Sequence, residues 1–203
     1  DYTGGGCPHI LAEPERTNLI PYSEDFSNAA WTKTNITIAS NSVTSPDGTV
    51  NADYLQENSS NATHIIRDGI SLSASDNTIS IYAKQGAGST RQIGLLFNTT
   101  GDGALFNLTD GSVAETRNSG IPKSETLGDG WFRFSVTAAT AAITENCRIY
   151  LGKDDVWTSA YTGDGTSGVY IWGCQVEQGS YATSYIPNFG TAAGVTRNQD
   201  IFT

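Results

Sequence analysis

Methionine is absent from the 203-residue chain, and cysteine and histidine are scarce, with three and two copies. Cys7, Cys147 and Cys174 are odd in number and widely spaced, which excludes a dense disulfide framework and a zinc-binding spacing. Cys147 and Cys174 each lie in an apolar strand pattern, so we expect both to be buried free thiols. Because position 1 is not methionine, we expect the chain to be covalently part of a longer polypeptide.

Positive charge is also scarce, with 11 Lys and Arg against 21 Asp and Glu and a net charge of -10. A nucleic-acid partner is not expected, because such binding needs a basic surface that neutralises phosphates. A membrane partner is not expected, because no apolar run is long enough to span a bilayer. The charge favours a neutral partner over a polyanionic glycan, unless basic residues gather in a local cleft.

Helical periodicity is missing too, whereas Gly, Ser, Thr and Asn are abundant. Alternating stretches such as "TISIYAKQ" and "GWFRFSVTAA" are typical of strands with one buried face. Nine or ten such strands predict an all-β fold, a β-sandwich jelly roll of two antiparallel sheets. We expect a linker or arm over residues 1–17, the sandwich over 18–190 and a C-terminal extension over 191–203.

Alternation also predicts which side chains point away from the core. It places outward Tyr82 and Lys84 in one strand, Arg133 in another, and Arg148 and Tyr150 in a third. The outer, concave face of one curved sheet is where we expect these five side chains to converge. They are candidate carbohydrate-binding residues.

The stretch "GKDDVWTSAYTGDG" holds Trp157 and Tyr161 in a polar loop. Loops often carry function, and an exposed indole can stack on the apolar face of a sugar ring. Trp157 and Tyr161 are therefore further carbohydrate-binding candidates. The alternative is that Trp157 only caps the end of the sandwich.

The stretch "GVYIWGCQVEQGSYATSYIP" is apolar on both faces when read in strict alternation. It predicts a strand that is buried on both sides or carries a bulge at Gly173. We expect packing roles for Tyr170 and Trp172, and expect Tyr181 and Tyr185 to hold the C-terminal segment on the sandwich.

Catalytic signatures are lacking. Most acidic residues lie in turns, so no pair of carboxylates suits glycoside hydrolysis. Tyr82, Arg133 and Arg148 leave a lyase cluster open, but His9 and His64 lie in no recognisable motif. We therefore predict that the protein is not an enzyme.

Several strings resemble a known family. "NLIPYSEDFSNAAW" and "GVYIWGCQVEQG" resemble the opening and closing strands of jelly-roll carbohydrate-binding modules of the family 4/9/22 type, and the likeness spans about Asn18 to Pro187. "PERTNLIPYSEDFSNAAWTK", "SPDGT" and the trailing "VTRNQD" are similar to domains of phage tail and other virion proteins. The resemblance implies a virion or extracellular location.

The resemblance also bears on calcium, which such modules often hold for structural reasons. Ser27 follows Phe26 and Trp172 takes the position of the usual Asp, so the sequence departs from the family's calcium ligands. Three Gly-Asp-Gly repeats suggest calcium loops but suit turns equally well. No cofactor is expected to be required, and structural Ca²⁺ stays an open alternative.

Three functions remain open from the sequence. The first is a non-catalytic carbohydrate-binding module that binds a neutral oligo- or polysaccharide. The second is an architectural virion domain without a small ligand. The third is a jelly-roll polysaccharide lyase or hydrolase.

Overall fold

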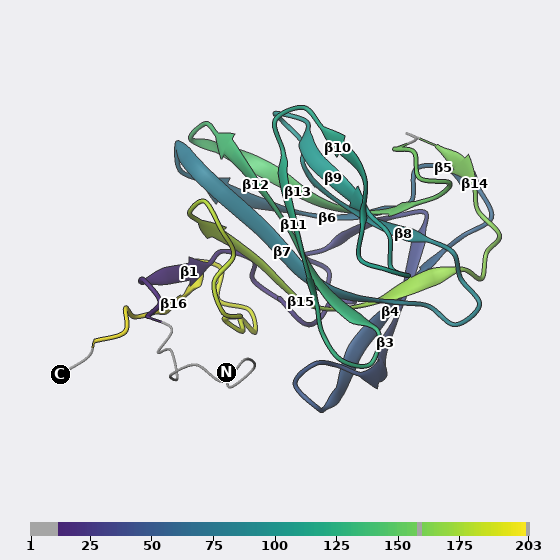
Figure 1. The fold of residues 1–203 in the computed structure, drawn as a ribbon, viewed down its shortest axis with the longest axis horizontal. Helices are drawn as coiled ribbons and strands as arrows, with labels where there is room; N and C mark the ends of the chain where they lie inside the picture. The colour runs from purple at the N-terminus through teal and green to yellow at the C-terminus, as the bar shows by residue number, and fades with distance from the viewer. Residues whose placement is uncertain (1–11, 158–159, 202–203) are drawn as a thin grey trace, which may run out of the picture.

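Two six-stranded antiparallel sheets face each other in the computed structural model, which describes residues 12–157 and 160–201 (Figure 1). The all-β sandwich predicted from the sequence is confirmed. Within the described residues no helix is present that could cross a membrane. Cys7, His9 and most of the predicted arm lie outside the described residues.

The first sheet, called the β13 sheet, contains in spatial order β10 (Val113–Arg117), β9 (Asp102–Phe106), β8 (Gln92–Phe97), β13 (Ile143–Gly152), β6 (Ile65–Leu72) and β2 (Thr32–Thr34). The second, called the β7 sheet, contains β11 (Ile121–Thr126), β12 (Trp131–Thr140), β7 (Ser75–Gln85), β15 (Gly168–Gln178), β4 (Val50–Glu57) and β3 (Ile36–Thr44). The chain crosses between the sheets several times, as when β6 leads to β7 and β7 to β8, so each sheet contains neighbouring strands that are distant in sequence.

Two small sheets lie at opposite ends of the sandwich (Figure 1). One pairs β1 (Arg16–Asn18) with β16 (Val195–Arg197), and the other pairs β5 (Asn61–Ala62) with β14 (Tyr161–Thr162). The expected boundary after residue 17 falls inside β1, and the expected C-terminal extension supplies β16. Residues 16–18 and 195–197, which are far apart in sequence, are therefore hydrogen-bonded to each other.

The core fills the space between the sheets with the residues that alternation placed inward. Ile79 and Ile81 of β7, Phe134 of β12 and Ile149 of β13 are all fully buried there. Trp31 packs against Phe26 with ring centroids 5.1 Å apart, as expected for two core anchors. Inward alternation is thus confirmed, because each strand has one face that only the opposite sheet can cover.

Strand β15 contains a bulge. The sequence predicted either this bulge or burial of the strand on both sides, because both of its faces are apolar. The register with β7 shifts between Trp172 and Gln175, and Gly173 adopts a φ of 61°. Before the bulge Ile171 faces the core, and after it Cys174 does. The extra residue turns Trp172 to the outer face while keeping both flanking segments in the core.

The outer face of the β7 sheet is partly covered by the segment after β15. Tyr185 packs on Trp172 with ring centroids 4.7 Å apart, and its hydroxyl lies 2.6 Å from the Ser23 hydroxyl. Trp172 is only 6% exposed as a result. Tyr181 is 48% exposed and lies beneath the Arg16 guanidinium. The packing roles predicted for Trp172 and Tyr185 are confirmed.

Candidate functional site

The expected convergence on one concave face is wrong. Tyr82, Lys84 and Arg133 lie on β7 and β12, whereas Arg148 and Tyr150 lie on β13 in the opposite sheet. All five side chains do point outward, but they point out of opposite sides of the sandwich. Alternation along one strand fixes the face of a side chain, but the sheet that receives the strand is decided by pairing between distant segments.

On the β7 sheet, Arg133 is engaged in packing. Its Nη2 donates to the Ser80 hydroxyl over 3.1 Å, and its guanidinium lies over the Tyr82 ring at 5.1 Å. Beside Lys84 there is a cavity of about 640 Å³ between the loops that precede β4 and β12, with Trp131 in its wall. Trp131 is only 3% exposed, so its ring face is not available for stacking.

Tyr161 belongs to a buried polar network and not to an open surface. Its hydroxyl donates to the Glu57 carboxylate over 2.6 Å, and the same carboxylate receives two hydrogen bonds from Arg91, at 2.6 and 2.7 Å. The His64 ring lies 4.6 Å from the Tyr161 ring. Burial and the bond to the Glu57 carboxylate raise the pKa of Tyr161. The structure thus places Tyr161 in a structural role at the end of the sandwich.

Trp157 lies on the outer face of the β13 sheet. Its ring packs 4.9 Å from the Tyr150 ring, in a cluster with Ile65 and Leu96. A Cβ at Gly94 would come within 2.9 Å of the indole, so the absent side chain lets the ring rest against β8. Nothing local in the sequence indicates this support, and Trp157 is half-buried instead of exposed. It is not an end cap.

A groove of about 370 Å³ opens beside Trp157, and we call it the Trp157 groove. Its lining includes Thr34, Arg67, Arg117, Arg148, Tyr150 and Trp157. Of the six predicted site residues other than Trp157, two, Arg148 and Tyr150, are therefore brought together with it, and four are not. Arg148 Nη1 donates to the Tyr150 hydroxyl over 3.0 Å.

Sequence reasoning missed Arg67 and Arg117. Arg67 lies directly opposite Arg148 in the pairing of β6 with β13, and the Arg117 guanidinium lies over the Trp157 ring at 5.2 Å. The alternation of "HIIRDGISL" puts Arg67 and Ile66 on opposite faces of the strand, and this pattern could have identified Arg67 as an outward residue. Nothing local in the sequence shows that β10 would carry Arg117 to the same groove.

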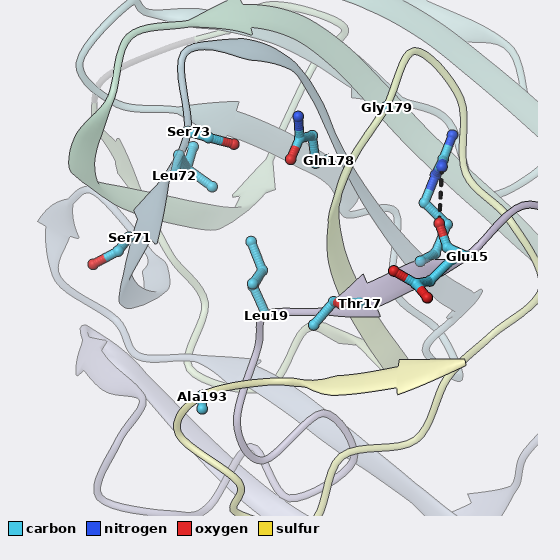
Figure 2. Close-up of a pocket in the computed structure, with 10 residues that line it drawn as sticks. Glu15, Thr17, Leu19, Ser71, Leu72, Ser73, Gln178, Gly179 and Ala193 are labelled. Atoms are coloured by element: carbon cyan, nitrogen blue, oxygen red, sulfur yellow. Dashed lines mark hydrogen bonds between the residues drawn. The ribbon is translucent and has the colours of Figure 1, made fainter. Parts of the chain in front are cut away.

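A cavity of about 720 Å³ lies elsewhere, next to the sheet of β1 and β16 (Figure 2). Hydroxyl and amide side chains border it, including Thr17, Ser71, Ser73 and Gln178. No aromatic ring lines it, so it offers no stacking surface for a sugar. The Trp157 groove combines aromatic rings with hydrogen-bond donors and is the better candidate site.

The described residues contain no group of three or more His, Cys, Asp and Glu side chains that could hold a metal ion. In the third Gly-Asp-Gly repeat, Asp164 accepts hydrogen bonds from the backbone amides of Thr166 and Ser167 at 2.8 and 2.7 Å. The Ser167 hydroxyl also donates to Asp164, over 2.6 Å. This bond first, and then the two amide bonds, lower the pKa of Asp164, and together they show the carboxylate closing its own turn.

No protein-family model and no curated protein matches the chain. Among solved structures, the enzymatically active domain of bacteriophage CBA120 tailspike protein 4 aligns with a TM-score of 0.44 and 12% identity, over 78% of this chain and 21% of that chain. The CBM22-1 xylan-binding domain of Paenibacillus barcinonensis Xyn10C aligns with a TM-score of 0.42 and 12% identity, over 85% of this chain and 97% of that domain. TmCBM61, solved with β-1,4-galactotriose, aligns with a TM-score of 0.45 and 10% identity, over 80% of this chain and 99% of that chain.

The chain thus spans about a fifth of the tailspike domain that it matches. Carbohydrate-binding modules recur among the similar structures, in agreement with the resemblance in sequence. TM-scores of 0.42 to 0.45 carry no argument about the ligand.

Proposed function

We propose that this domain is a non-catalytic carbohydrate-binding module whose ligand lies in the Trp157 groove. The observation that carries the proposal is the half-buried Trp157 ring packed beside Tyr150 in a groove lined by guanidinium and hydroxyl groups. An indole supplies the apolar contact for the C–H face of a sugar, and the donors bind its hydroxyl groups.

A non-catalytic role is supported by the separation of the residues that kept a lyase alternative open. Tyr82 and Arg133 lie on the β7 sheet, while Arg148 lies on the β13 sheet, so these three side chains cannot act on one substrate. The likeness of several strings to phage tail domains supports a further proposal, that the module belongs to a virion or extracellular adhesion protein. The net charge of -10, taken over the whole chain, supports a neutral polysaccharide as the ligand.

Calorimetric titration with neutral and acidic oligosaccharides tests the proposal. We expect a Kd between about 1 μM and 1 mM, which corresponds to about -8 to -4 kcal/mol. Trp157→Ala should weaken binding by about 1–3 kcal/mol, by analogy with aromatic stacking on planar ligands. Trp157→Phe should retain part of the affinity because a ring remains.

Two variants separate binding from folding. Trp172→Ala should cost about 3–5 kcal/mol of stability as a large-to-small change at a buried position. Trp157→Ala should cost less, because Trp157 is only half-buried. Tyr181→Ala, which removes an exposed ring far from the groove, should leave both affinity and melting temperature unchanged. Unchanged affinity in a folded Trp157→Ala protein would refute the proposed site.

A further inference from the structure

Two arginines face each other directly in the Trp157 groove. Arg67 and Arg148 are cross-strand partners of β6 and β13, and both point to the outer face. Like charges at directly opposed positions destabilise a sheet. Arg117 of β10 lines the same groove.

None of these three arginines has a carboxylate within ion-pair distance among the described residues. This is unexpected in a chain with 21 acidic residues and 11 basic ones. Glu115 is the carboxylate bonded to Trp157, where it accepts a hydrogen bond from the backbone amide and forms no ion pair with these arginines. Positive charge is thus concentrated, without neutralising partners, in one small part of an acidic molecule.

Arg148 also has a hydrogen-bond donor that lacks an acceptor. Its Nε is buried and has no hydrogen-bond partner in the described structure, while its Nη1 donates to Tyr150. A buried donor without an acceptor costs free energy in the protein as it stands. The fold therefore holds a cluster of donors whose natural complement is an anion.

We propose that the Trp157 groove binds an acidic sugar, with Arg67, Arg117 and Arg148 recognising the anionic group of a pyranose that contacts Trp157. The inference rests on the proposed carbohydrate-binding function and replaces the neutral ligand that net charge suggests. The planar guanidinium fork matches a carboxylate in two parallel hydrogen bonds, so a uronic-acid carboxylate suits the groove best. Sulfated sugars share the same anionic chemistry.

The test compares oligouronates with their carboxyl-reduced counterparts, which keep the sugar chain but lose the charge, and with sulfated oligosaccharides of similar length. Calorimetry is run on the whole chain and on Arg67→Gln, Arg117→Gln and Lys123→Gln. Lys123→Gln is the matched control, because this substitution also removes one positive charge, but from an exposed strand of the opposite sheet.

We expect the wild-type protein to bind the oligouronate at least about 10-fold more tightly than the reduced form, and more weakly as salt rises. Arg67→Gln and Arg117→Gln should each lower oligouronate affinity by about 10- to 100-fold, as for loss of a charged hydrogen bond, and Lys123→Gln should not. Arg67→Gln should also hold or raise the melting temperature, because it removes the repulsion with Arg148.

Each contrary result has a distinct meaning. Equal or tighter binding of the reduced oligosaccharide overturns the acidic-sugar inference and leaves the proposed function standing. Binding of the sulfated form alone keeps an anionic ligand but rejects the carboxylate. No binding by any of the three arms overturns both the inference and the proposed function. Loss of affinity in Lys123→Gln equal to that in Arg117→Gln shows a long-range charge effect and overturns the groove assignment.

Discussion

At the scale of single residues, Glu57 shows how a buried charge is held in this fold. Its side chain is fully buried and receives hydrogen bonds from Arg91, Tyr161 and the Asp164 amide. Burial alone would raise the pKa of Glu57, but the hydrogen bonds from Arg91 and Tyr161 outweigh burial and lower it. Because the folded state holds the ionised form, this stabilisation is present above the pKa of an unfolded Glu and is lost as pH falls through the folded pKa.

We predict that Glu57→Gln lowers the free energy of unfolding by about 3–5 kcal/mol at neutral pH, because buried Arg91 loses its buried carboxylate partner and keeps only a 3.3 Å contact with the half-exposed Asp164. Urea unfolding measures the loss, and it should shrink as pH falls through the lowered folded-state pKa of Glu57, where the wild-type carboxylate is protonated. Lys123→Gln is the control, since it breaks an exposed pair worth about 0–1 kcal/mol. A loss for Glu57→Gln as small as that of the control would contradict the prediction.

At the scale of elements, the bulge in β15 decides which aromatic side chains are outside. Gly173 has a positive φ, and a Cβ there would lie 3.0 Å from the Tyr82 ring and 3.4 Å from the Tyr185 ring. An alanine would suffer both the backbone strain and the crowding. The bulge therefore depends on glycine at this position.

Gly173→Ala should destabilise the domain by about 1–3 kcal/mol in thermal or urea unfolding. Gly69→Ala in β6 is the matched control, because its φ is not positive and its nearest atom to a new Cβ is 3.9 Å away. That variant should be neutral or slightly stabilising, since alanine suits a strand better than glycine. Equal effects of the two substitutions would show that the bulge tolerates a side chain.

At the scale of the whole molecule, the core isolates its two described thiols from solvent. Cys147 and Cys174 are free and buried between the sheets. Burial raises the pKa of both thiols, so neither supplies the thiolate that reacts with alkylating agents. The prediction of buried free thiols is confirmed for these two, and Cys7 lies outside the described residues.

We predict that iodoacetamide labels neither Cys147 nor Cys174 in the native protein, and that all three cysteines are labelled in guanidinium chloride. Peptide mapping by mass spectrometry assigns each label. Reduction should leave the melting temperature unchanged, because no bridge supports the fold. A gain of two hydrogens on reduction, together with a large fall in melting temperature, would contradict this prediction.

The sequence by itself determined the fold class and the inward or outward face of most strand residues. Period-two alternation is a local property, because successive side chains of a strand point to opposite sides whatever the strand pairs with. Ile81, Phe134 and Ile149 could thus be placed in the core, and Tyr150 and Arg148 outside it. Local chemistry also indicated the bulge at Gly173, as one of two alternatives for a strand with two apolar faces, and the structure decided between them.

Only the tertiary structure decided which outward residues share a surface. Pairing between strands far apart in sequence put Arg148 and Tyr150 on one side of the sandwich and Tyr82 and Arg133 on the other. The same pairing brought Arg67 and Arg117 to Trp157 and turned Tyr161 into a partner of Glu57. Net charge is a sum over the chain, whereas a binding groove depends on the few charges that the fold places beside one another.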